Sequence, residues 1–201
     1  EEGYRTFDVS SFRGYQDIIL NIPDDQFILY RGQNQDKPLL PKIARFNLPN
    51  AEDVEREMLE DFQRRSIHLI DYHPGNSWDW LALAQHHGMA TRLLDWTENP
   101  LIALWFSMTP VTEASIQEYS VVWAFNVPKE DIINSTDDRD PFSGAGNKVF
   151  KPNHITKRIS AQFGWFTIHK SSPGKRFISF EHNPEYRDRL FKIRVDCRCF
   201  A

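Results

Sequence analysis

The feature of this sequence that most constrains its fold is the order of its hydrophobic patterns. In the first half, apolar residues recur at the spacing of amphipathic helices, whereas the second half carries apolar runs of strand length. Helices followed by strands, without regular alternation, favour an α+β fold. We therefore expect helices grouped in the N-terminal half and packed on a mostly antiparallel sheet.

The helical patterns have recognisable ends. Asn50 and Asn99 stand at N-cap positions, Pro100 suits the first helical position, and Gly88 is suited to follow a helix C-terminus. The last helix is apolar on every side and is predicted to be buried. The expected helices cover residues 10–21, 50–70, 77–87 and 100–108.

The strand patterns are shorter. The segment 120–127 is almost continuously apolar, which is typical of a central strand. The first strand is predicted to end at Gly32, and the polar stretch 134–153 is predicted to be a long loop. The expected strands cover residues 27–31, 91–96, 120–127, 163–170, 175–181 and 190–196.

Composition limits the classes of function. The 201 residues suit a single domain spanning 1–201, and the net charge of −4 without a basic block gives no strong nucleic-acid signal. No apolar run has transmembrane length and no signal peptide is recognisable, so no membrane association is expected, and the cytoplasm is the expected compartment. The two cysteines, Cys197 and Cys199, form no disulfide framework and are a weak metal signal, so no metal site is predicted.

Tyr30-Arg31-Gly32-Gln33 is the first candidate site segment. On a strand, Arg31 shares a face with Phe27 and Leu29, which indicates that this face is buried. A buried guanidinium needs an anionic partner, which is either the phosphate or carboxylate of a ligand or the side chain of Asp95. The similar tripeptide around Arg13 falls in the first expected helix and is given no site role.

The second candidate segment runs from residue 85 to residue 100 and is dense in polar side chains. Adjacent His86 and His87 cannot both face one point from a helix, so a two-histidine metal site is not expected. One of them is either a general base or a hydrogen-bonded core histidine. The candidate ligand-binding or catalytic residues here are Gln85, His86, His87, Thr91, Arg92, Asp95, Trp96 and Thr97.

A third segment, 157–169, places neutral polar groups among aromatic residues. Its side chains are candidates either for ligand recognition by hydrogen bonds or for capping backbone ends. The residues concerned are Arg158, Gln162, Trp165 and Thr167.

These segments together resemble the FRG domain family, which is named for an aromatic-Arg-Gly motif. The resemblance covers roughly residues 10–170, and its most specific part is the block from Trp80 to Leu101. It implies a widespread bacterial and phage family and leaves the reaction open. The motif stretches that carry it are Tyr30 to Gln33, Pro41 to Arg45, Trp80 to Gly88, Thr91 to Leu101, and Arg158 to Thr167.

A second resemblance, to ADP-ribosyltransferases of the Arg-Ser-Glu class, suggests a chemistry. It implies that Arg31 holds the phosphates of NAD and that Thr97 positions a ribose, with Trp96 or Trp165 stacking on a base. NAD would then be the substrate, with no other cofactor indicated. The motif departs from the family in two places, because Asp95-Trp96-Thr97 stands at the Ser-Thr-Ser position and Gln162 at the catalytic glutamate, for which Glu181 is a less well-placed substitute. Without that carboxylate, nucleotide binding can survive the loss of transfer.

The sequence leaves several functions open. One is a divergent ADP-ribosyltransferase or NAD glycohydrolase in which Arg31, Asp95, Thr97 and Gln162 converge. Another is a sensor module that binds a nucleotide or a protein partner without chemistry. A third is a hydrolase or nuclease that uses a histidine with Asp95. In the remaining case, the motifs form a buried polar network that stabilises the fold.

Overall fold

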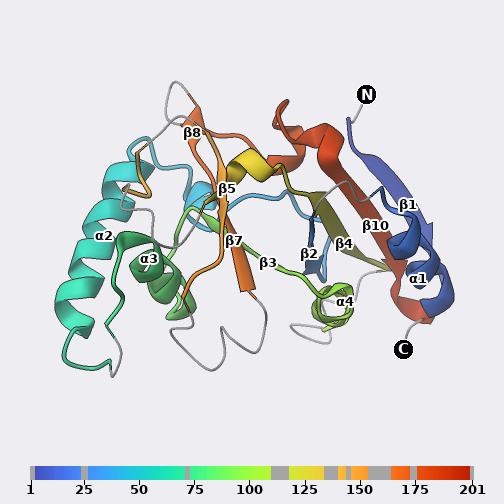
Figure 1. Ribbon diagram of the computed structural model, residues 1–201, viewed down its shortest axis with the longest axis horizontal. Helices are drawn as coiled ribbons and strands as arrows, with labels where there is room; N and C mark the ends of the chain where they lie inside the picture. The colour runs from blue at the N-terminus through green and yellow to red at the C-terminus, as the bar shows by residue number, and fades with distance from the viewer. Residues whose placement is uncertain are drawn as a thin grey trace. The chain divides into compact units, whose positions relative to one another are not determined.

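The computed structural model describes residues 3–23, 27–70, 73–109, 118–133, 140–143, 146–153, 164–172 and 176–199. Within these ranges the chain forms four α-helices, all of them before residue 110, followed mainly by strands (Figure 1). The predicted α+β order is therefore confirmed. The helices are α1 (Phe12–Asn21), α2 (Ala51–Ser66), α3 (Ser77–His86) and α4 (Pro100–Met108).

The strands pair mostly antiparallel, as predicted. Antiparallel ladders join β10 to β4, β4 to β2, β2 to β3, β6 to β7 and β8 to β9, whereas β1 with β10 and β5 with β6 are parallel. The strands are β1 (Arg5–Val9), β2 (Ile28–Gln33), β3 (Leu93–Thr97), β4 (Tyr119–Asn126), β5 (Ile132–Ile133), β6 (Lys148–Phe150), β7 (Gly164–Ile168), β8 (Ser171–Ser172), β9 (Arg176–Phe177) and β10 (Leu190–Asp196).

Two compact units make up the chain. The first consists of residues 1–39, 96–129 and 179–201, and the second of residues 40–95 and 130–178. Each has its own hydrophobic core. No helix in the described part of the chain has the length and apolar character needed to cross a membrane.

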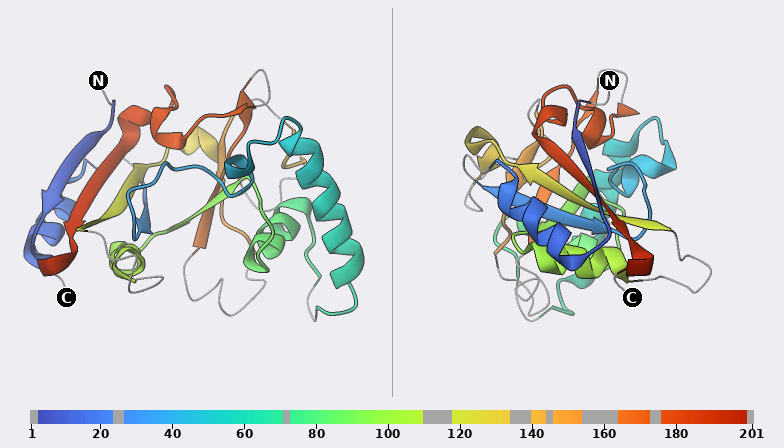
Figure 2. Two further views of the ribbon diagram at one scale, coloured as in Figure 1. Left: turned by 180° about the vertical axis from the view of Figure 1, so that it is seen from behind. Right: turned by 90° about the vertical axis from the view of Figure 1, so that its right-hand side faces the viewer.

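In the first unit the strand order is β1-β10-β4-β2-β3. Helices α1 and α4 share one face of these strands (Figure 2), and the Tyr15 hydroxyl of α1 donates a hydrogen bond of 2.7 Å to the carbonyl oxygen of Pro100. The core on this face comprises Val9, Tyr15, Ile22, Tyr30, Ala103, Leu104, Val122, Ala124, Phe191, Ile193 and Val195.

The prediction that the first strand ends at Gly32 was wrong, because β2 continues to Gln33. A Cβ atom at Gly32 would lie 1.9 Å from the carbonyl oxygen of Ala103 and 2.7 Å from the backbone nitrogen of Ser107. The missing side chain therefore lets α4 approach the strand closely. Its role is tertiary packing rather than strand termination.

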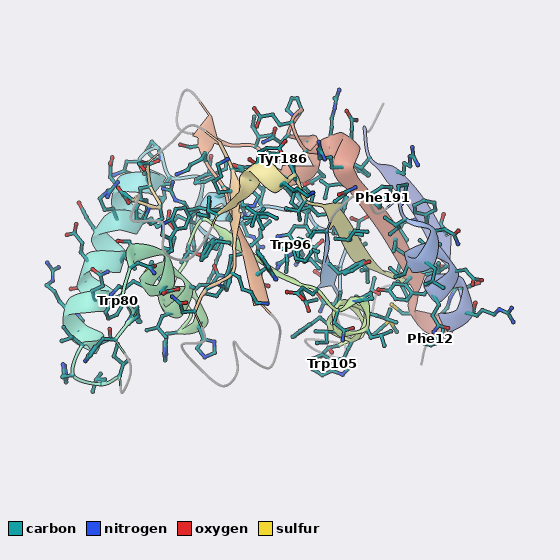
Figure 3. All side chains as sticks on the ribbon, in the orientation of Figure 1. Phe12, Trp80, Trp96, Trp105, Tyr186 and Phe191 are labelled. Atoms are coloured by element: carbon teal, nitrogen blue, oxygen red, sulfur yellow. The ribbon has the colours of Figure 1, made fainter. Side chains whose placement is uncertain are left out.

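The prediction that α4 is buried on every side was wrong. Small residues, Ala103 and Ser107, face the sheet, while Trp105 is 62% exposed on the outer side (Figure 3). Leu101 and Phe106 are exposed as well. The close approach at Gly32 requires small side chains on the inner face, which leaves the larger apolar ones outside. As predicted, Asn99 caps the helix and Pro100 begins it.

The second unit is built on α2 and α3 and the strand order β7-β6-β5. Its β6 lies inside the stretch that was predicted to be a loop, since Lys148–Phe150 pairs with β7. Residues 134–139 and 144–145 of that stretch lie outside the described residues. The core contains Leu59, Trp78, Leu81, Ala82, Ala84, Leu93, Ile133, Phe142, Phe150, Phe166 and Ile168.

Two other features differ from the sequence prediction. The strand expected over 175–181 is reduced to β9, and a 3-10 helix, Phe180–His182, follows it. Strand β1 was not predicted at all, and it pairs with β10. As predicted, α3 ends before Gly88, whose positive φ of 93° suits a residue without a side chain.

Candidate functional site

Arg31 lies on β2 between β4 and β3 in the first unit. Tyr30 and Gly32 point toward α4, so Leu29, Arg31 and Gln33 point to the opposite face. Both faces are covered, since Leu29 and Tyr30 are buried, and Arg31 itself is half-buried. The aromatic-Arg-Gly motif thus divides between two faces of one strand, and only its arginine lies on the face opposite α4.

Arg31 belongs to a row of side chains that runs across three strands. Its partner in register on β4 is Trp123, whose partner on β10 is Lys192. We call these three residues the Arg31 row. The indole nitrogen of Trp123 donates a 3.0 Å hydrogen bond to Oε1 of Gln33, and the ring of Tyr4 meets the indole edge-on at 5.1 Å. Arginine, lysine, amide and aromatic groups therefore adjoin on this face.

An aromatic cluster occupies the same face beside the Arg31 row. Phe125 is the partner in register of Leu29, and its ring lies 5.7 Å from Trp96 and 4.9 Å from Phe180. Trp96 is only 3% exposed. Core packing accounts for Trp96, so we leave it out of the proposed ligand contacts.

Thr97 pairs in register with Tyr30 and is also buried. Its Oγ1 accepts a 3.2 Å hydrogen bond from the backbone N–H of Asn99, whose side chain caps α4. This contact shapes the turn from β3 into α4. The Thr97 hydroxyl retains its own proton for donation.

The second unit holds a chain of polar contacts between α3 and β3. The Thr91 hydroxyl donates to Oε1 of Gln85, and Nε2 of Gln85 donates to Oδ1 of Asp95 at 2.8 Å. His86 is half-buried and His87 exposed, with their rings edge-on at 5.4 Å. Among the described residues, no group of three or more His, Cys, Asp or Glu could hold a metal ion.

Arg92 is fully buried and forms an ion pair with Glu55 of α2. Nε of Arg92 donates to Oε2 of Glu55 at 2.7 Å, and the backbone N–H of Arg92 donates to Oε1 at 2.7 Å. Burial raises the pKa of Glu55, while the Arg92 guanidinium and these hydrogen bonds oppose the rise. The guanidinium also lies 4.5 Å from the Phe142 ring centroid. This pair accounts for Arg92 structurally, so we leave it out of the proposed ligand contacts.

The third segment is described only in part, since Arg158 and Gln162 lie outside the described residues. On β7, the ring of half-buried Trp165 lies 5.4 Å from Nζ of Lys151. Thr167 is buried, with Oγ1 at 2.8 Å from Nε2 of His169.

The predicted convergence of the catalytic candidates remains a prediction. Arg31 and Thr97 belong to the first unit, Asp95 belongs to the second, and Gln162 is not described. Glu181, the substitute for the catalytic glutamate, is buried, and its Oε2 accepts a 3.0 Å hydrogen bond from the backbone N–H of Leu39. That contact gives Glu181 a structural role.

Comparison with known proteins adds one decisive observation, because residues 26–115 match the model of the FRG domain family. The chain contains an FRG domain. No curated protein matches the chain, and neither does any solved structure. The FRG domain match begins just before β2 and ends just after α4, so it includes Arg31 and the segment from Gln85 to Thr97.

The matched FRG domain is shorter than the resemblance seen in the sequence. Strands β4 and β10, which supply Trp123 and Lys192 to the Arg31 row, lie outside it. The third segment lies outside it as well. The extent of a single FRG-type domain over 1–201 and the likeness to ADP-ribosyltransferases remain predictions.

Proposed function

We propose that this FRG-domain protein binds a phosphate-bearing nucleotide in the cytoplasm, with NAD as the first candidate and Arg31 as the phosphate contact. The observation that supports the proposal is the position of Arg31. It lies half-buried on a strand that is flanked on both sides, on the face opposite α4. A planar guanidinium held at such a place suits bidentate contact with a phosphate.

The surroundings of Arg31 favour a rigid binding site. The close packing of α4 on Gly32 holds β2 in place, and a ligand contact on a held strand loses little conformational entropy on binding. Trp123 and Tyr4 supply aromatic surface, and Gln33 supplies an amide on the same face. Aromatic and amide groups beside a cation match the base and the phosphate of a nucleotide.

Binding without turnover is the form of the proposal that the contacts favour. Oδ1 of Asp95 accepts a hydrogen bond from Gln85, and the oxygen of Thr97 accepts one from Asn99. Both groups thus have structural partners, as expected for a sensor module. A hydrolase or nuclease that used a histidine and Asp95 together with a metal ion would need a cluster of metal ligands, and the described residues hold no such group of three or more His, Cys, Asp or Glu.

Calorimetric titration of NAD and ADP-ribose into the protein tests the proposal. Replacing Arg31 by Ala removes charged hydrogen bonds worth about 1.5–3 kcal/mol each, so the affinity should fall roughly tenfold to more than a hundredfold. Arg31→Lys should recover only part, because an ammonium cannot make the bidentate contact.

Arg13→Ala is the matched control. Like Arg31, this arginine stands between an aromatic residue and a glycine, but it lies on the exposed surface of α1. Equal affinities for wild type, Arg31→Ala and Arg13→Ala would refute the proposal. Release of nicotinamide from NAD that is lost in Arg31→Ala would show turnover and favour the transferase or glycohydrolase instead.

A further inference from the structure

We propose that Asp36 competes with the ligand for Lys192, because its carboxylate occupies the position at which Lys192 would bind a second phosphate. The ligand class would then be a nucleoside diphosphate or a dinucleotide with a diphosphate bridge, and the second phosphate would displace Asp36. This inference rests on the proposed nucleotide binding by Arg31. It adds a second phosphate contact and an internal counter-ion to that site.

The first step is the geometry of the Arg31 row. Arg31 and Lys192 flank Trp123 on either side, because each is the partner in register of Trp123 on a neighbouring strand. Partners in register point to the same face of a sheet. Neighbouring strands lie about 4.8 Å apart, so the two cationic residues have backbones about 10 Å apart with the indole between them. Two long side chains at that separation can both reach one small polyanion.

The second step concerns how the two partners of the ion pair are held. Nζ of Lys192 lies 2.8 Å from Oδ2 of Asp36, and also 5.4 Å from the ring centroid of Trp123 and 5.9 Å from that of Tyr4. The Lys192 side chain is only 13% exposed, whereas that of Asp36 is 47% exposed and belongs to no helix or strand. The ammonium is therefore fixed by aromatic rings, and the carboxylate is the partner that can leave.

The third step is energetic. An ion pair whose carboxylate is half-exposed to solvent is a weak one, so displacing Asp36 costs little. A phosphate brings more negative charge and more acceptor oxygens than a carboxylate, and it makes stronger charge-assisted hydrogen bonds. A terminal or bridging phosphate near Lys192 should therefore replace Asp36.

The same face supplies a matched control pair. Arg194 of β10 and Asp8 of β1 are partners in register, with Nε of Arg194 2.6 Å from Oδ1 of Asp8. Both residues of this pair lie on strands, whereas Asp36 does not. Replacing Asp8 changes the net charge as much as replacing Asp36 does, but frees no cation of the Arg31 row.

The experiment is calorimetric titration of ADP, AMP and inorganic pyrophosphate into four variants of the full chain and the wild type. Asp36→Asn should raise the affinity for ADP and pyrophosphate by about threefold to fivefold, the equivalent of removing a weak ion pair whose carboxylate is half-exposed. Lys192→Gln should lower the affinity for ADP toward that for AMP. In the double variant Asp36→Asn with Lys192→Gln, the gain should vanish, and Asp8→Asn should change nothing.

Two results would overturn the inference: an unchanged pyrophosphate affinity in Asp36→Asn, or an equal gain in Asp8→Asn, which would indicate a general charge effect. Circular dichroism checks that Lys192→Gln folds. If it does not fold, the comparison of Asp36→Asn with the wild type and Asp8→Asn still tests the inference. Failure of the proposed function is seen separately, as NAD binding that Arg31→Ala leaves intact. Pyrophosphate binding to Asp36→Asn would still report on Lys192 in that case.

Discussion

Two arginines show how differently the two compact units use charge. In the second unit, Arg92 is completely shielded from solvent and bonded to the equally buried Glu55. In the first unit, Arg31 is half-buried on a strand face that also carries Lys192, Gln33 and aromatic rings. A fully enclosed arginine serves the fold, whereas one that retains access to solvent can serve a ligand.

The packing of the two units differs in the same sense. In the first unit, the backbones of β2 and α4 come close together because Gly32 has no side chain and the facing residues of α4 are small. The second unit places a buried ion pair in its interior and covers it with Phe142, whose ring lies 4.5 Å from the guanidinium carbon of Arg92 and 4.5 Å from that of Arg56. The first unit should therefore be sensitive to added atoms and the second to removed charges.

The largest expected effect is in the second unit. Replacing Glu55 by Ala removes the buried carboxylate at 2.7 Å from Arg92 and leaves the guanidinium only the partly exposed Glu52 at 3.5 Å. Breaking a buried ion pair in this way costs about 3–5 kcal/mol. Urea denaturation followed by tryptophan fluorescence measures the loss.

The control for Glu55→Ala lies on the same helix. Asp61 pairs with Arg65 at 2.7 Å, but on the surface of α2, so Asp61→Ala should leave the midpoint unchanged. Similar losses in both variants would mean that helix propensity, rather than the buried charge, explains the effect, and the contrast between the units would fail.

A smaller effect is expected from Gly32→Ala in the first unit. The new methyl group would overlap the Ala103 carbonyl, so α4 must move, and overpacking of this kind costs about 1–3 kcal/mol. Gly75→Ala is the control, because a Cβ there meets nothing within 4 Å. Denaturation midpoints that are equal for the two variants would contradict the close approach of α4.

The smallest expected effect involves Lys170 and is a change in how the stability of the fold depends on pH. Its Nζ donates to the carbonyl oxygens of Pro141 and Ser143, at 2.6 Å each. Burial, with a contribution from the Arg92 charge, lowers the pKa of Lys170 from 10.5 to about 8. Between these two values the unfolded chain binds more protons than the folded one, so this residue makes stability rise with pH.

Lys170→Gln tests this sign. The wild type should gain stability relative to the variant as the pH rises from about 8 to 10.5, whereas the difference should be constant below pH 7. Denaturation series at matched ionic strength measure the difference. Curves that stay parallel across this range would show that burial does not depress the pKa of Lys170.

The elements that could be predicted from the sequence are those with local signals. Asn99 and Pro100 mark the start of α4, and Gly88 marks the end of α3, because capping depends on residues that lie next to each other. Gly32 was misread for the complementary reason. A glycine inside an apolar strand suggests a stop, but the helix that requires it lies some seventy residues away.

The ion pair of the second unit illustrates what a closer reading could have found. Ala51, Glu55 and Leu59 are spaced four residues apart and form the buried stripe of α2, so a glutamate in that stripe predicts a buried partner. The pattern of Val54, Met58 and Phe62, which was used to predict the helix, marks its half-buried flank instead. That the partner would be Arg92 depends on tertiary structure, which no local pattern contains.

The parallel pairing of β1 with β10 has a consequence for folding during synthesis. Arg5–Val9 pairs with Phe191–Val195, and Asp8 and Arg194 are 186 residues apart. At about 5–20 residues per second, translation reaches β10 roughly 10–40 s after β1 has been synthesised. Until then Phe7 and Val9 have no neighbouring strand to cover them. Strand β1 is thus synthesised well before its partner β10, and its native pairing can form only after that interval.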